Sequence, residues 1–583
     1  MRGDLSLVTT KRIGSNRHLG LRAFYQFRRF SGRGILLLIL AVLVLFPLVS
    51  IGETALGQSL SGSTSLTFHY LARVISGSGE GHTFLVTLVF GLGAALTATG
   101  LGTVLAWLVV KTDLPGYRAI RLLSYLLFAV PGLLKVIGTI ELFNPGSGFF
   151  WVFLHKFAPG LNFSLDTIPG MIWTQGLLWT PVAFLFMSST FEQMDSSFEE
   201  AALAIGVRGG RTYRYISFGL ARPAAAASLL LTFIAAVTSV EVPLFLGQPN
   251  RIPTVTGVMY QRFSESLTIN YSSVAALALI LIVPVILLVF AYGSFLRKGR
   301  SYVTVTGRGY RVKRIQVKGP KRLLGLFSLG IIVAMLLLPI VALLWVAFLT
   351  RVIPPTDFHE ALSSLTLSQF TTAFSNSGIV SSAYNTVIVS LVSASLVVAF
   401  ALISGWYIVW GKRTMSRSLD FLTSVPLVYP GLLIGLGVLL AYIRYPVYDT
   451  IWMFVLVYAA QFLPYGIRYV ESGYRGLSRE LVEAGETSGA HRTRRITKIL
   501  LPLLWPSLIS GWLFTYLLCL QELGASLLVA GPNTPVISVA LYQATTQGST
   551  GMVAAFGLVV AAVGCLLGVL VTRLAKGGLS LNV

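Results

Sequence analysis

The stretch "WTPVAFLFMSSTFEQMDSSFEEAALAIG" (residues 179–206) has a counterpart 283 residues later, "FLPYGIRYVESGYRGLSRELVEAGETSG" (462–489). Each segment starts as an apolar run and ends in a short stretch of acids and small residues that closes on a glycine. Pro181 matches Pro464, Glu200 matches Glu483 and Gly206 matches Gly489 at one constant spacing. Such internal similarity indicates a chain built from two copies of one unit.

Two further pairs of segments extend the duplication. "VPGLLKVIGTIELF" (130–143) matches "YPGLLIGLGVLLAY" (429–442), and "EVPLFLGQPN" (241–250) matches "ELGASLLVAGPN" (522–533). The matches occur in the same order in both copies, from the N-terminal to the C-terminal side. The composition places both copies in lipid, because only 11% of the 583 residues are charged and 55% are hydrophobic. A soluble domain carries roughly 25% charged residues.

Apolar runs long enough to cross a bilayer predict twelve transmembrane helices, since a spanning helix needs about 20 mostly apolar residues. The predicted spans are 35–51, 83–110, 118–142, 168–190, 225–247, 272–296, 323–350, 383–410, 419–443, 450–470, 503–530 and 551–574. The apolar stretch 148–157 is too short to span and is read as an interfacial helix or a loop element.

The net charge of +23 is explained by topology and not by nucleic-acid binding, because the basic residues flank the apolar spans. With the N-terminus inside, only six of the 44 Lys and Arg residues fall in outer loops: Arg73, Lys156, Arg251, Arg262, Arg351 and Arg444. The basic segment 1–34 then reads as a cytoplasmic tail before an uncleaved first span, with cleavage near 54–57 as the alternative. Both termini are expected in the cytoplasm.

The segment 297–322 divides the two copies and carries ten Lys and Arg residues and no acid. It is predicted to be a cytoplasmic linker, with binding of anionic lipid as a second reading. The first half then covers 35–296 and the second half 323–583. Because six spans is an even number, both halves enter the membrane from the same side. The expected fold is an all-α polytopic membrane protein with two parallel six-helix halves and a pathway between them.

The acidic, alanine-rich loops predict a short helix in each half. Serines at 196 and 197 precede glutamates by three residues, which is the spacing of a capping box. Gly206 and Gly489 suit the left-handed position just past a helix end. A short helix on the cytoplasmic side without a core of its own favours docking into a partner's groove. A solvated connector is the plainer alternative for either loop alone.

These loops resemble the signature of permease subunits of binding-protein-dependent ABC importers, in which Glu-Ala-Ala, three residues, Gly, nine residues and Ile-x-Leu-Pro follow in order. The second half matches at Glu483, Ala484, Gly485, Gly489, Ile499, Leu501 and Pro502. The first half matches at Glu200, Ala201, Ala202, Gly206 and Ile216, and departs afterwards at Phe218 and Gly219. The likeness covers nearly the whole chain and is strongest to the fused permeases of the iron(III) importer group.

The resemblance implies a type I importer permease in a bacterial inner membrane. In that family each such helix docks on an ATP-hydrolysing subunit. The sequence contains no G-x-x-x-x-G-K-[ST] P-loop, so ATP and magnesium are expected on a separate ABC ATPase subunit, present in two copies. An extracytoplasmic binding protein is expected to deliver the substrate. The chain itself is then a transport permease without enzyme activity or cofactor.

Charged residues in the spans suggest where substrate passes, because ionisable side chains in lipid usually face protein or water. Glu241 and Glu522 occupy equivalent places late in the fifth and eleventh predicted spans. Ferric iron prefers carboxylate oxygen, so these two acids are candidates for a cation path. The alternative is that each hydrogen-bonds within the bundle or pairs with a base such as Lys135. No spacing argues for a firm metal site, and Cys519 and Cys565 read as packing residues.

Other substrates and other transport classes stay open at this point. Relatives in the same broad group carry thiamine, phosphonates, sulfate or polyamines. A secondary transporter driven by an ion gradient would instead show inverted repeats, and a channel would need no ATPase partner. The parallel halves and the duplicated loop favour the ATP-driven importer.

Overall fold

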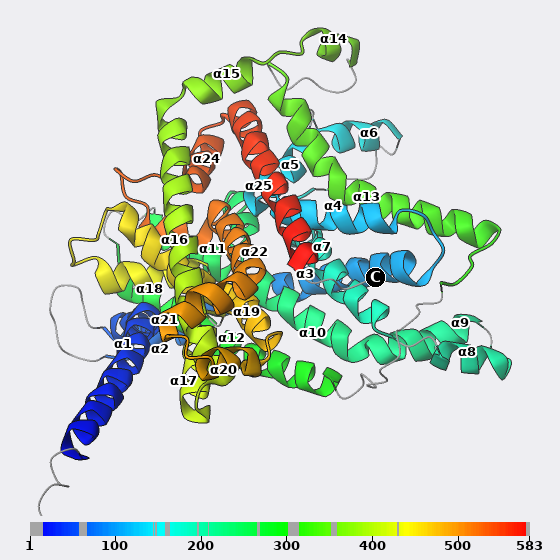
Figure 1. Cartoon of the computed structure of the whole chain (residues 1–583). Helices are drawn as coiled ribbons and strands as arrows, with labels where there is room; N and C mark the ends of the chain where they lie inside the picture. Colours follow the sequence, from blue (N-terminus) through cyan, green and yellow to red (C-terminus); the bar gives the residue numbers. More distant parts are fainter. Residues whose placement is uncertain are drawn as a thin grey trace, which may run out of the picture.

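The structure is a computed structural model that describes residues 15–57, 67–143, 145, 148–157, 164–194, 197–207, 209–264, 269–300, 314–350, 358–427, 429 and 431–578. Helices account for almost all of this part of the chain (Figure 1). The predicted basic tail lies outside the described residues up to position 14, and so does most of the basic linker, at 301–313.

The first half runs from α1 to α12. Its elements are α1 (Ser15–Ala55), α2 (His69–Ser76), α3 (Ser78–Lys111), α4 (Tyr117–Ala129), α5 (Gly132–Phe143), α6 (Phe149–Phe157), α7 (Ile168–Glu192), α8 (Ser197–Ala204), α9 (Gly209–Thr212), η1 (Tyr213–Ser217), α10 (Phe218–Val237), η2 (Pro243–Gly247), α11 (Val255–Ser264) and α12 (Tyr271–Arg300).

The second half follows the same general order, with one helix added at Phe358–Ser363 and none between Tyr442 and Ile451, a stretch that the structure describes in full. Its elements are α13 (Pro320–Ala347), α14 (Phe358–Ser363), α15 (Ser368–Ser375), α16 (Ser377–Trp410), α17 (Arg413–Ser424), η4 (Val425–Leu427), α18 (Leu432–Tyr442), α19 (Ile451–Arg475), α20 (Arg479–Thr487), α21 (Arg492–Arg495), η5 (Ile496–Leu500), α22 (Leu501–Leu520), α23 (Gly524–Val529), α24 (Ile537–Thr546) and α25 (Thr550–Gly578).

Ten helices in the described residues are long and apolar enough to span a membrane, and two bent helix pairs bring the total to as many as twelve. The predicted spans 118–142 and 419–443 are these bent pairs and are not straight helices. The α4–α5 pair bends by 103° and the pair formed by α17–η4 and α18 bends by 108°. Pro131 and Gly132 lie at the first bend, where proline cannot continue the helix. Broken helices in membrane proteins line protein-enclosed or watery space.

The first helix of each half packs against the other half. α1 contacts α18, and α13 contacts α5, while each also contacts the last helix of its own half (Figure 1). Glycines permit these crossings. A Cβ on Gly437 would lie 2.8 Å from the Pro47 carbonyl oxygen of α1, and a Cβ on Gly138 would lie closer still to that of Pro339 in α13. Because the first helix of each half packs on the opposite half, these two crossings join the halves around α5 and α18.

The most extensive packing inside each half joins equivalent helices. α3 packs along α7 in the first half, and α16 packs along α19 in the second. The apolar stretch 148–157 forms the short helix α6. Cys519 is fully buried and Cys565 half-buried, and both are free thiols, in agreement with their interpretation as packing residues.

Candidate functional site

Each duplicated loop forms a short helix that ends at a left-handed glycine, as the sequence predicts. α8 is followed by Gly206 with φ +82°, and α20 is followed by Gly489 with φ +76°. The amide of Val207 donates to the carbonyl of Ala202 at 3.0 Å, and the amide of Ala490 donates to that of Gly485 at 3.0 Å. These bonds close both helices in the same way, with a glycine in the position that L-residues avoid.

Within each motif, the first and the second small residue face different directions. The sequence pattern alone does not reveal this difference. Ala201 and its counterpart Ala484 are exposed. Ala202 is buried against the body of the chain, and a Cβ on the equivalent Gly485 would lie 2.8 Å from Ile499. The second small position of each motif therefore faces the chain itself, and only the first faces outward. The second position seats the helix on its own half.

The glutamates of the motifs, Glu200 and Glu483, are both exposed, and Glu483 pairs with Arg479 of the same helix at 2.9 Å. Exposed glutamates and alanines give each helix an outward surface that a partner can contact. α8 with α9, and α20 with α21, project from different parts of the molecule (Figure 1). The two outward surfaces are therefore separate from each other.

The segment after each short helix has the same geometry in both halves. π-Helical turns occupy Tyr213–Ser217 and Ile496–Leu500, at the spacing of the repeat, and each leads into a long membrane helix. The first half keeps this geometry although Phe218 and Gly219 replace the leucine and proline of the motif. Each π-turn continues directly into the long helix that follows it, α10 or α22.

Glu241 and Glu522 do not lie inside transmembrane helices, which corrects the predicted spans 225–247 and 503–530. The spanning helices run over Tyr213–Val237 and Thr493–Leu520, about ten residues earlier than predicted. Each acid follows the break after its helix and lies at the start of the next helical turn. A carboxylate at such an N-terminus is stabilised by the exposed amide groups.

Glu241 lies against the bend between α4 and α5. Its Oε2 atom is 3.1 Å from the Ser239 hydroxyl, which is also 3.1 Å from Oε1 of the buried Gln175 in α7. A Cβ on Gly132 would lie 3.2 Å from Oε1 of Glu241. Lys135 is within electrostatic range of Glu241, while its ammonium group donates to the Leu127 carbonyl at 3.1 Å. Lys135 therefore caps the broken end of α4 as well as balancing the acid.

Glu522 has a similar environment in the second half. Its Oε1 atom accepts from the Ala525 amide at 3.0 Å, and its Oε2 atom accepts from the Gln461 side chain of α19 at 2.9 Å. Both acids are half-buried. A Cβ on Gly524 would lie 3.2 Å from Val240, so the two acid-bearing segments meet where the halves join. The two carboxylates are close enough to interact electrostatically.

A repeated amide–carboxylate bond ties the segments after the acids to the starts of α7 and α19. Asn250 donates to Asp166 at 3.0 Å, and Asn533 donates to Asp449 at 2.9 Å. Both pairs follow the repeat spacing of 283 residues. The "PN" dipeptide shared by the two halves is the sequence signal that identifies these pairs, and the contact fixes the far end of each acid-bearing segment.

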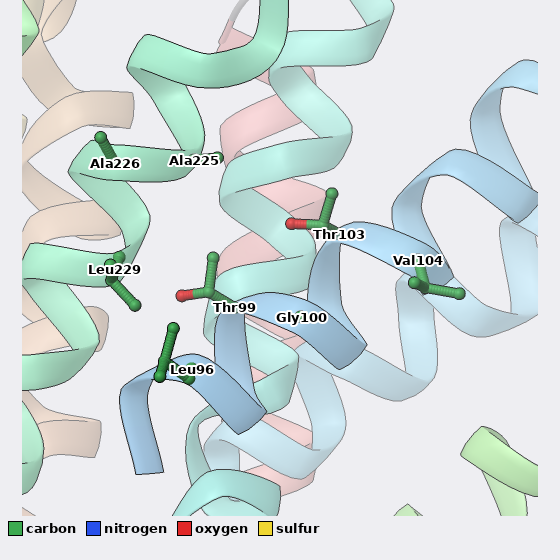
Figure 2. Close-up of a pocket in the computed structure, with 8 residues that line it drawn as sticks. All are labelled: Leu96, Thr99, Gly100, Thr103, Val104, Ala225, Ala226 and Leu229. Atoms are coloured by element: carbon green, nitrogen blue, oxygen red, sulfur yellow. The ribbon is translucent and has the colours of Figure 1, made fainter. Parts of the chain in front are cut away.

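An open groove of about 420 Å³ lies between α3 and α10, and its lining is uncharged, unlike that of the acid pair (Figure 2). Alkyl groups and the hydroxyls of Thr99 and Thr103 line it, with no charged side chain. In the second half, Trp512 stands at the repeat position of the lining residue Leu229, and its indole donates to Ser395 of α16 at 3.0 Å. The groove lies on two candidate membrane-spanning helices and contains no carboxylate or ammonium group among its described lining residues.

No cluster of three His, Cys, Asp or Glu residues that could hold a metal ion occurs in the described part of the chain. The acid pair therefore offers two carboxylates with hydrogen-bonded neighbours and no closed coordination cage.

Comparison with known proteins gives a family match in both halves. The model of "Binding-protein-dependent transport system inner membrane component" matches residues 98–300 and again 397–577. The two matches contain the two short helices α8 and α20, and both acids. The duplication read from the sequence is thus confirmed as two copies of one transport domain.

The chain is also similar to several curated permeases. It is 25% identical to the ferric transport system permease protein FbpB of Actinobacillus pleuropneumoniae over 510 residues, which is 84% of this chain and 69% of the relative. It is 25% identical to the Fe(3+)-transport system permease protein FbpB 2 of Haemophilus influenzae over 523 residues, 88% of this chain and 92% of the relative. A relative from Salmonella paratyphi A, named for 2-aminoethylphosphonate transport (PhnV), is 26% identical over 221 residues, 37% of this chain and 81% of its own.

Proposed function

Because this chain belongs to the family of binding-protein-dependent transport system inner membrane components, we propose that it is the whole membrane pathway of one importer. The chain is a fused permease with two family domains and ten to twelve candidate spanning helices. Other subunits supply ATP hydrolysis and substrate capture. The two halves of this chain then provide the pathway between them.

The observation that carries the coupling role is the repetition of one local structure. α8 and α20 lie at the same place in their halves, end at left-handed glycines with φ +82° and +76°, and lead through equal π-turns into membrane helices. Each presents an exposed alanine and glutamate. We propose that one ATPase subunit docks on each helix, so that the complex contains two. ATP-driven closure of the ATPase pair then moves both helices.

The orientation follows from the charge distribution. The docking helices, the linker and both termini lie in the cytoplasm, because the Lys and Arg residues concentrate on that side of the predicted spans. The opposite face receives the binding protein, and the helices α2, α6 and α14 belong to it. The substrate enters between the halves on that side.

For the substrate we propose ferric iron. The relatives named for ferric transport match 84% and 88% of this chain, whereas the one named for a phosphonate matches 37%. The pair Glu241 and Glu522 presents two carboxylates at the junction of the halves, and carboxylate oxygen suits a hard cation. An anionic substrate would be repelled by two neighbouring acids, although Lys135 lies near one of them.

Reconstitution tests this function directly. The chain, its co-expressed ATPase and a binding protein from the same genomic neighbourhood are placed in proteoliposomes with ATP inside. Uptake of radiolabelled ferric iron that depends on ATP and on the binding protein is expected. Uptake of 2-aminoethylphosphonate instead of iron would replace the substrate proposal while retaining the importer. Uptake driven by an ion gradient without ATPase would contradict the importer itself.

A further inference from the structure

We infer that Lys111, Glu199 and Ser217 are positioning residues that hold the first docking helix rigidly, whereas the second docking helix is held loosely. This inference rests on the proposed function only in naming α8 and α20 as docking helices. The two helices differ in how firmly the rest of this chain anchors them. That difference can be measured without the ATPase.

Three elements of the first half meet at one buried carboxylate. The ammonium group of Lys111, the last residue of α3, lies 3.1 Å from Oε1 of Glu199 in α8. The Ser217 hydroxyl, from the π-turn η1, donates to the same oxygen at 2.7 Å. Lys111 is 0% exposed and Glu199 is 6% exposed. Buried charges are expensive to separate, so this contact fixes α8 against both α3 and η1.

The end of the linker between the halves is hydrogen-bonded to the end of α3, at Lys111 and the residues that follow it. Ile315 donates its amide to the Lys111 carbonyl at 2.7 Å, and the Asp113 amide donates to the Ile315 carbonyl at 3.0 Å. The Val317 amide donates to the Asp113 side chain at 2.9 Å, and the Arg314 guanidinium lies over the Tyr117 ring at 5.5 Å. The end of the linker, the end of α3 and α8 are therefore one connected unit.

The second half replaces all three polar residues with apolar ones. α16 has the same length as α3 and ends at Trp410 where α3 ends at Lys111. At the repeat spacing, Val482 stands for Glu199 and the buried Leu500 stands for Ser217. The three positions belong to three elements, and all three have apolar residues in the second half. Only the first half has charged residues at these positions.

The attachment of the two helices differs accordingly. α8 buries Glu199 and Ala202, whereas α20 has no buried residue. α20 is connected to the rest of the chain by an ion pair between the exposed Glu486 and the half-buried Arg495, and by the contact of Gly485 with Ile499. Its half-buried Val482 also packs on the apolar core. An ion pair whose carboxylate is exposed to solvent contributes less to the anchoring than the buried pair that holds α8. α20 is therefore the compliant docking helix and α8 the rigid one.

The test is spin-label mobility at matched positions. Single cysteines replace the exposed Ala201 or Ala484 in the full chain, with both native cysteines changed to alanine, and the labelled protein is studied in lipid nanodiscs. The label at position 201 should give the more immobile electron paramagnetic resonance spectrum. Lys111→Met should shift that spectrum towards the mobile component and leave the label at position 484 unchanged.

Two further variants separate positioning from folding. The charge reversal Lys111→Glu with Glu199→Lys should restore immobility at position 201. The triple change Lys111→Trp, Glu199→Val and Ser217→Leu copies the second half, and should give position 201 the mobility of position 484. Equal mobilisation of both labels by Lys111→Met, or no change at 201, would overturn the inference. Failure of ATPase docking would instead overturn the proposed function, since these spectra need no ATPase.

Discussion

Replacing Gly206 or Gly489 with valine should uncouple ATP hydrolysis from transport without disturbing the bundle. A Cβ at either position meets nothing within 4 Å, so no steric clash with the rest of the chain occurs. The cost comes from the backbone, because φ is +82° and +76°. Left-handed backbone costs an L-residue roughly 1–2 kcal/mol, and a β-branched residue is especially disfavoured there.

This strain energy is small compared with the stability of the helix bundle. It is large enough to change the position of one short helix. It changes the population ratio of correctly placed to misplaced docking helix by roughly 5–30-fold. Substrate-stimulated ATP hydrolysis, measured in the reconstituted complex with its binding protein, should fall by about that factor when expression and membrane insertion are normal. The second site should be at least as sensitive, because α20 has no buried residue to hold it.

Two control variants isolate the backbone effect. Gly206→Asn adds a side chain that tolerates the left-handed region, and should retain coupling. Gly548→Val places the same strain after α24, where φ is +84°, the space is open, and Ser549 donates to Ala544 at 3.0 Å in the same closing bond. It should leave coupling intact. Wild-type stimulation in both Gly206→Val and Gly489→Val would refute the reasoning and make the loops simple connectors.

Three other outcomes follow from the structure. Changing both Glu241 and Glu522 to glutamine should slow iron uptake while basal ATPase activity and assembly stay normal, and unchanged uptake would remove the acids from the path. Gly437→Ala places a methyl group 2.8 Å from the Pro47 carbonyl, and should lower stability by about 1–3 kcal/mol through overpacking; an unchanged melting temperature would contradict the α1–α18 crossing. A cysteine at Ser301, in the basic linker, should resist a membrane-impermeant label applied outside intact cells, and labelling from outside would reverse the topology.

Much of the architecture could be predicted because it depends on local pattern. Apolar runs marked the spans, and the repeated Glu200 and Glu483 motifs marked short helices with left-handed glycines. The bends before α5 and α18 were missed because hydropathy registers composition and not direction. For the same reason Glu241 and Glu522 were placed inside helices that end several residues before them. The proline–glycine step at 131–132 was the available signal.

The buried contact of Lys111 with Glu199 could not be predicted from either residue alone. A lysine after a long apolar run normally marks the membrane boundary, and a glutamate in a short amphipathic helix normally faces water. Their pairing depends on the packing of α3 against α8, which no local pattern encodes. The duplicate offered the only indication, since Trp410 and Val482 occupy the same two places.

The most direct test of the coupling role is the number of ATPase subunits held by each docking helix. Native mass spectrometry of the complex, purified from membranes with its co-expressed ATPase, should show two ATPase subunits per chain. Ala201→Arg and Ala484→Arg each place a bulky charge on the exposed face of one docking helix, and together they should abolish ATPase binding while the chain remains folded in the membrane. Two bound ATPase subunits in the double variant, or none in the wild type, would contradict the account.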